Sequence, residues 1–171
     1  MPDATLKVVI NAPIRPNQPG RGFYQLEEDA LFVPIGIYAA DRRFFSFIES
    51  EHVRLDCDKA GELLFIEITL ARKQWQIDGA LVPPKHAATA DLRWLDFRAQ
   101  MPNPAVLTDK KHSLVCIKFS DAKPATAYQM AEAVIAEVTK ELRVCRIWIT
   151  EIIDDVAGKE ISAFRRQQSA S

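Results

Sequence analysis

A nine-residue segment occurs twice in this chain, and its pattern is typical of a buried β-strand. Residues 63–71 read LLFIEITLA, and residues 114–122 read LVCIKFSDA. Both copies place apolar residues, an isoleucine, a charged residue, an apolar residue and a hydroxyl residue in the same order. Each copy also follows an apolar run that begins with aspartate. The echo predicts a sheet built by duplication of a strand unit, with Ile66 and Ile117 at equivalent positions.

Length and composition predict one domain over residues 1–171. A chain of 171 residues buries about 70% of its unfolded surface when it folds, so it needs neither a disulfide nor a metal to hold a core. Apolar residues make up 48% and charged residues 26% of the chain, a balance that excludes global disorder.

The net charge and the cysteines limit which partners and which cellular compartment are expected for this chain. The net charge is −1, which gives no basic field for nucleic acid. The three cysteines form no CxxC pair, as in a reduced cytoplasmic protein with buried thiols. The first residues lack the pattern of a signal peptide. No window has the ~20 apolar residues that span a bilayer, so we expect no membrane segment.

The chain divides into four parts by composition. Residues 1–22 are a short β-branched strand followed by a proline-rich arm, because closely spaced prolines block both helix and central strand. Residues 23–122 hold the tandem β units. Residues 123–166 are expected to form a helix and C-terminal strands, and residues 167–171 a polar tail.

The helix is predicted at about residues 124–142. Apolar residues recur there at helical spacing and form one stripe. The stripe consists of Ala127, Met130, Ala131, Val134, Ile135, Val138 and Leu142. Pro124 is tolerated in a first helical turn, and residues 126–129 resemble a capping box. Because strands surround this segment, the predicted fold class is α+β, a mainly antiparallel sheet with one long helix packed on it.

The strand predicted at residues 144–153 is apolar on both faces, and one helix cannot cover a broad sheet. A second copy of the chain is the simplest cover, so we expect a homodimer. The alternative is that residues 71–90, which show no clear pattern, fold back over the sheet.

The first β unit carries a resemblance to a known family. It begins with Tyr24 and Asp29-Ala30-Leu31-Phe32-Val33, continues as Val53-x-Leu55-Asp56-x-Asp58-x-x-Gly61, and ends on Ile66-Glu67-Ile68. Residues 24–71 resemble domain of unknown function 2283, a family of small prokaryotic domains, and residues 90–122 echo it more weakly. Phe65 and Cys116 stand where that family has a glycine. The resemblance implies paired strands and a tight turn, and no established activity or catalytic residue.

Side chains capable of chemistry are scattered along the chain. The turn with Asp56, Asp58 and Glu62 lacks the alternating oxygen ligands of a calcium loop, and aspartates are common in turns for their backbone hydrogen bonds. The three histidines share no metal-ligand spacing with each other or with cysteine. The sequence has no glycine-rich phosphate loop and no nucleophile motif. We therefore expect no metal and no cofactor.

Two functions remain open from the sequence. The first is a non-enzymatic protein that acts by self-association or by binding a protein partner. The alternative is a small-molecule enzyme whose site gathers scattered residues. Its candidate residues are His52, Asp56, Asp96 and Glu151. A polar pocket with converging titratable groups distinguishes the two.

Overall fold

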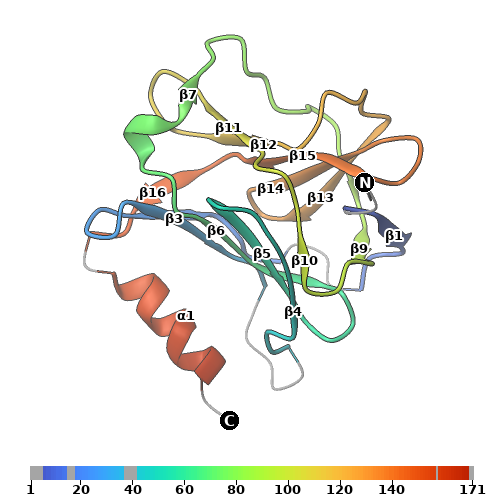
Figure 1. Cartoon of the computed structure of the whole chain (residues 1–171), viewed down its shortest axis with the longest axis horizontal. Helices are drawn as coiled ribbons and strands as arrows, with labels where there is room; N and C mark the ends of the chain where they lie inside the picture. The colour runs from blue at the N-terminus through green and yellow to red at the C-terminus, as the bar shows by residue number, and fades with distance from the viewer. Residues whose placement is uncertain (1–5, 15–17, 37–41, 157, 170–171) are drawn as a thin grey trace.

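Two β-sheets pack face to face, and a short helix lies on the outer side of one of them (Figure 1). The computed structural model describes residues 6–14, 18–36, 42–156 and 158–169. Each sheet has seven strands within these ranges. One large apolar cluster draws residues from both sheets, among them Leu55, Ile66, Val134 and Ile147. This shared core joins the two sheets.

The first sheet, which we call sheet 1, contains the first β unit. Across it run β10 (Ala99–Gln100), β4 (Ser46–Glu49), β5 (Val53–Cys57), β6 (Leu63–Ile68), β3 (Ala30–Pro34), β2 (Gly22–Gln25) and β16 (Ile152–Asp154). The five inner strands are antiparallel, whereas the short outer strands β10 and β16 run parallel to their neighbours.

Sheet 2 repeats this plan. Across it run β7 (Gln76–Ile77), β11 (Ala105–Thr108), β12 (Val115–Lys118), β15 (Val144–Ile149), β14 (Val134–Val138), β13 (Thr126–Ala131) and β8 (Ala88–Thr89). Again a short strand pairs in parallel at each edge. A separate pair, β1 (Val8–Asn11) and β9 (Asp91–Trp94), lies beside the sheets. No described helix is long and apolar enough to cross a membrane.

The two echoed segments are both strands, as predicted, since they form β6 and β12. Ile66 and Ile117 are both fully buried in the shared core. Their places in the strand order differ, however, because β6 is the fourth strand of its sheet and β12 the third. Ile66 and Ile117 are therefore not equivalent in strand order. A common origin of the two segments stays a prediction.

The helix predicted at residues 124–142 is wrong, and with it the long-helix part of the α+β prediction. The segment is a hairpin of β13 and β14, so the protein is mainly antiparallel sheet. Val134, Ala136 and Val138 alternate into the shared core. The apolar stripe fits a strand because its last part is rich in β-branched residues.

The turn of this hairpin explains why the sequence misleads. Glu132 and Ala133 occupy it, and both types favour helix. Their backbone N–H groups donate instead to the carbonyl oxygens of Gln18 (2.8 Å) and Gly20 (2.8 Å). The Arg21 guanidinium also pairs with the Glu132 carboxylate at 2.6 Å. Contacts from the distant proline-rich arm thus override local propensity. Residues 15–17 of that arm lie outside the described residues.

The C-terminal part also differs from the prediction. Residues 160–166, expected as a strand, lie in the helix α1 (Lys159–Ser169), which also takes in the start of the expected polar tail. Asp155 caps this helix, since its carboxylate accepts hydrogen bonds from the backbone N–H of Glu160 (3.5 Å) and Ile161 (3.3 Å). Residues 170–171 lie outside the described ranges.

The segment 71–90 covers the outer face of sheet 2. It begins with the 3₁₀ turn η1 (Arg72–Gln74), and a loop between β7 and β8 then crosses the sheet (Figure 1). Leu81 and Ala87 from this loop pack against Cys116, Ile135 and Trp148. The fold-back alternative is therefore confirmed for this face. The argument for a dimer through the same face loses its basis.

Candidate functional site

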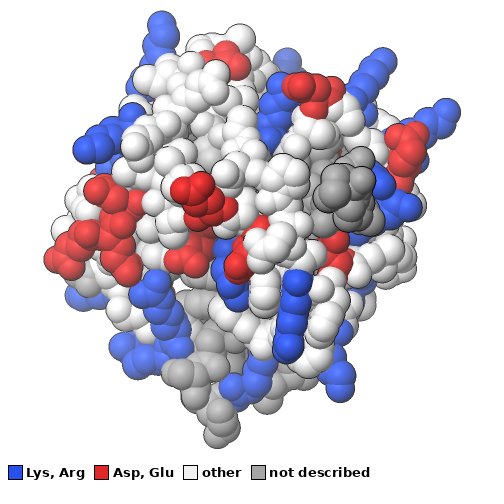
Figure 2. All heavy atoms as spheres, in the orientation of Figure 1, with Lys and Arg blue, Asp and Glu red and all other residues white. Residues whose placement is uncertain are grey.

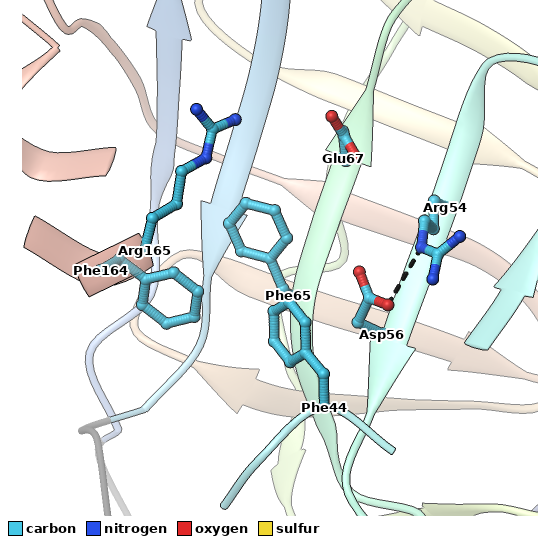
Figure 3. Close-up of a pocket in the computed structure, with 7 residues that line it drawn as sticks. All are labelled: Phe44, Arg54, Asp56, Phe65, Glu67, Phe164 and Arg165. Carbon is cyan, nitrogen blue, oxygen red and sulfur yellow. Dashed lines mark hydrogen bonds and ion pairs between the residues drawn. The ribbon is translucent and has the colours of Figure 1, made fainter. Parts of the chain in front are cut away.

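The outer face of sheet 1 carries an aromatic cluster that α1 covers on one side. Phe23, Phe32 and Phe65 point outward from β2, β3 and β6, and the buried Ile161 of α1 packs on them. At the margin of the helix, toward β5, lies a pocket of about 400 Å³ (Figure 3). The pocket is lined by Phe44, Arg54, Asp56, Phe65, Glu67, Phe164 and Arg165.

Three phenylalanines form the apolar wall of the pocket. Phe65 and Phe164 stack with ring centres 5.0 Å apart. Phe44 lies 5.8 Å from Phe65 and 6.1 Å from Phe164 by the same measure. The Phe44 side chain is nevertheless 41% exposed, so part of an aromatic surface is open to a ligand.

Asp56 provides the most deeply buried carboxylate of the pocket. It is only 4% exposed, and its Oδ1 accepts a hydrogen bond of 3.0 Å from Arg54 Nε. The other carboxylate oxygen turns away from Arg54, toward the space beside Phe65 and Glu67 (Figure 3). Burial raises the pKa of Asp56 above its usual value, although Arg54 acts in the opposite direction.

Glu67 is the second carboxylate of the pocket. It lies on β6, where its Cα is paired with that of Arg54 on β5. Burial raises the pKa of the half-buried Glu67, and the nearby Arg165 only partly offsets this effect. Among the described residues, none makes a hydrogen bond or an ion pair within 4 Å to its carboxylate. Glu67 therefore keeps its acceptor capacity.

The two guanidinium groups of the pocket are held by carboxylates and phenylalanine rings. Arg54 donates to Glu49 at 2.6 Å, and its guanidinium carbon lies 4.3 Å from the ring centre of Phe47. Arg165 lies 4.7 Å from the ring centre of Phe32 and 3.8 Å from the Glu28 carboxylate.

On the face shown in Figure 2, acidic side chains gather at the left, where Figure 1 places the turn between β2 and β3.

The charged side chains around the pocket are of both signs. The lining itself is balanced, with two carboxylates and two guanidinium groups, and two further carboxylates pair with those guanidinium groups. The carboxylates are Glu28, Glu49, Asp56 and Glu67, and the guanidiniums belong to Arg54 and Arg165. An aromatic wall beside carboxylates that can still accept hydrogen bonds suits a cation.

The structure does not bring together the four residues predicted for an enzyme site, and of these Asp56 alone lines the pocket. His52 lies in the turn between β4 and β5, 3.7 Å from Glu51. Asp96 Oδ2 accepts a hydrogen bond of 2.7 Å from the backbone N–H of Leu6. Glu151 pairs with Arg21 at 2.8 Å.

Other candidate groups have structural roles. Asp58 Oδ1 accepts the backbone N–H of Ala60 and Glu62, each at 2.9 Å, and so stabilises the turn between β5 and β6. Asp154 pairs with Arg72 at 2.9 Å. In the described ranges, no three His, Cys, Asp or Glu side chains are grouped to hold a metal. All three cysteines are buried, and burial raises the pKa of Cys116 to about 12.

Sequence reasoning missed most of the pocket. Glu67, Phe44, Phe164 and Arg165 are not among the four residues predicted for an enzyme site, and the helix that brings Phe164 and Arg165 to the pocket is not predicted. One signal was present: Arg54 and Asp56 on β5 alternate with core residues, as Phe65 and Glu67 do on β6. In a sheet, such alternation places all four on one face. That face carries the pocket.

A scan against models of protein families finds no match to this chain, and a search of curated proteins finds no similar sequence. The resemblance of residues 24–71 to domain of unknown function 2283 therefore stays a prediction.

Proposed function

We propose that this protein is a non-enzymatic binding module and that a protein partner inserts a side chain into the pocket beside α1. The observation that carries the proposal is Asp56, which is buried with one carboxylate oxygen turned into an open pocket. Arg54 donates to the first oxygen, no described residue donates to the second, and the pocket leaves the second oxygen accessible. A ligand that donates to the second oxygen completes the arrangement.

The electrostatics of the pocket support a role in binding rather than in folding. Burial raises the pKa of both Asp56 and Glu67, so the folded state disfavours their charged forms. At neutral pH these two groups therefore contribute unfavourably to stability. Residues that lower stability at a pocket are typical of functional sites.

The surface next to the pocket supports a protein as the partner. Phe45 and Phe97 are exposed, and their ring centres lie 5.7 Å apart. The Arg98 guanidinium carbon lies 5.5 Å from the Phe45 ring centre and 4.9 Å from that of Phe97. Arg98 also has a positive φ of 48°, a conformation that is strained for this residue type. Exposed aromatic residues and arginine are enriched where proteins bind each other.

The test uses amide spectra of isotope-labelled protein and a set of peptides, acetyl-Gly-Gly-X-Gly-Gly-amide, in which X is each amino-acid type. At least one peptide is expected to shift the amides of residues 54–56 and 65–67 in a saturable way. Asp56→Asn should remove the shifts. The control Asp121→Asn, at an exposed site paired with Lys118 (2.7 Å), should keep them. Shifts that persist in Asp56→Asn, or none with any peptide, contradict the proposal.

Self-association in the cytoplasm is a second form of this proposal. It is supported by the exposed Phe44, Phe45 and Phe97, which a second copy of the chain would bury, and by the three free cysteines, which suit a reducing compartment. Sedimentation at micromolar concentration is expected to find a dimer, and the double variant Phe45→Ser/Phe97→Ser a monomer. If the wild-type protein is a monomer, self-association is excluded, and binding of a different protein remains as the proposed function.

A further inference from the structure

We infer that the side chain received by the pocket is an arginine of the partner, bound through its guanidinium group. The inference rests on the proposed function and adds the chemical class of the ligand.

The outer face of sheet 1 already packs guanidinium groups between a phenylalanine ring and a carboxylate. Arg54 lies over Phe47 and donates to Glu49 and Asp56. Arg165 repeats the arrangement, over Phe32 and beside Glu28. A guanidinium group suits such a site because it is flat, stacks on rings and donates in the plane of a carboxylate.

The pocket offers rings and carboxylates once more, beside its own Arg54 and Arg165. Its wall has the rings of Phe44 and Phe164, and its floor has the second oxygen of Asp56 and the carboxylate of Glu67. Asp56 is paired with Phe65, and Glu67 with Arg54, so the two carboxylates are diagonal neighbours on one face of adjacent antiparallel strands. Carboxylates placed in this way can share the donors of one guanidinium group.

Charge and size agree with this ligand. The carboxylates of Asp56 and Glu67 on the floor of the pocket oppose an anionic ligand. A volume of about 400 Å³ holds a guanidinium group with its aliphatic stem. An ammonium group is compact and strongly hydrated, and it cannot stack on a ring and donate to two carboxylates in one plane as guanidinium does.

The test compares peptides that differ in a single group. The probes are acetyl-Gly-Gly-X-Gly-Gly-amide with X as arginine, citrulline, lysine, trimethyllysine or glutamate, titrated into labelled protein at neutral pH. Citrulline has nearly the shape of arginine without the charge. The arginine peptide is expected to bind at least about tenfold more tightly than the citrulline and lysine peptides, since charge-assisted, bidentate hydrogen bonds distinguish it.

Variants then locate the binding. Glu67→Gln and Phe44→Ala change half-buried or exposed side chains, so both should fold and both should weaken the arginine peptide at least about fivefold. The control Asp121→Asn should leave the affinity unchanged. Lowering the pH should weaken binding before ordinary carboxylates protonate, because burial raises the pKa of Asp56 and Glu67.

Each outcome decides the matter. If citrulline equals arginine, or if lysine, trimethyllysine or glutamate binds better, the arginine inference is wrong while the pocket remains a binding site. If the arginine peptide binds equally well to Glu67→Gln and Phe44→Ala, it binds elsewhere and the inference is wrong. If none of the probes binds and no other X does, both this inference and the proposed function fall.

Discussion

Replacing Ile161 with alanine should detach α1 without unfolding the two sheets. Ile161 is 2% exposed and is the buried contact of α1 with the aromatic cluster of sheet 1. The shared core between the sheets contains no residue of α1. The helix therefore depends on the sheets, whereas the sheets do not depend on the helix.

The magnitude follows from the size and contacts of the helix. An isolated helix of 11 residues must overcome a nucleation free energy of about 4 kcal/mol. Burial of Ile161 contributes about 2–3 kcal/mol and the half-buried Phe164 about 1 kcal/mol. The stacked Phe65–Phe164 pair adds roughly 1 kcal/mol, and the Asp155 cap about 1 kcal/mol. Docking is thus favourable by only about 1–2 kcal/mol, less than the 2–5 kcal/mol that an Ile→Ala change removes.

Hydrogen exchange and urea unfolding measure the two parts separately. In Ile161→Ala, the amides of α1 should lose their protection while those of β5, β6, β14 and β15 keep theirs. The free energy of unfolding should fall by no more than about 1–2 kcal/mol, the free energy of docking. Ser162→Ala, at an exposed position of the same helix, is the matched control. A loss of 3 kcal/mol or more in the global value, or protected α1 amides, refutes the reasoning.

Three further measurements test the fold and the site. Val134→Asp places an unpaired carboxylate in the shared core and should unfold the protein. The control Val82→Asp, at a 66% exposed site, should leave the thermal midpoint nearly unchanged. Equal midpoints for the two variants would contradict the burial of Val134 in the core. Glu67→Gln should stabilise the protein more as pH rises from about 4 to 7, because the raised pKa of Glu67 makes the stability of the wild type fall as this carboxylate ionises. A difference in unfolding free energy between variant and wild type that does not change with pH would contradict the raised pKa. The three thiols should react with a disulfide reagent only after unfolding, because burial raises their pKa, in the case of Cys116 to about 12. A single thiol that reacts rapidly in the native protein would contradict this expectation.

The hairpin of β5 and β6 shows which parts of the fold the sequence predicts well. Val53 and Leu55 alternate with polar residues, and Asp58 and Gly61 supply turn chemistry between two strands. Gly61 has a φ of +87°, and a Cβ there would meet the Trp94 carbonyl oxygen at 2.6 Å. Pattern, turn and sterics all agree in this segment, and the predicted hairpin is confirmed.

The hairpin of β13 and β14 shows where such prediction ends. Its turn holds Glu132 and Ala133, and nothing local to it favours a turn. The hydrogen bonds that fix it come from Gln18 and Gly20, more than a hundred residues earlier in the chain. The pocket is missed because Phe164 and Arg165 reach it on α1, in a segment where the sequence predicts C-terminal strands.

The plan of the two sheets explains why the pocket lies where it does. A parallel strand of two or three residues lies at each edge of both sheets, so little of either edge is free to pair with another chain. The loop between β7 and β8 covers apolar residues on the outer face of sheet 2. On sheet 1, α1 covers the side formed by β2, β3 and β6. Among the described residues, no helix covers the side formed by β4 and β5, whose outward side chains include Phe47, Arg54 and Asp56. This face combines charged and aromatic side chains, a mixture that is typical of binding surfaces. The pocket lies where this face meets the margin of α1.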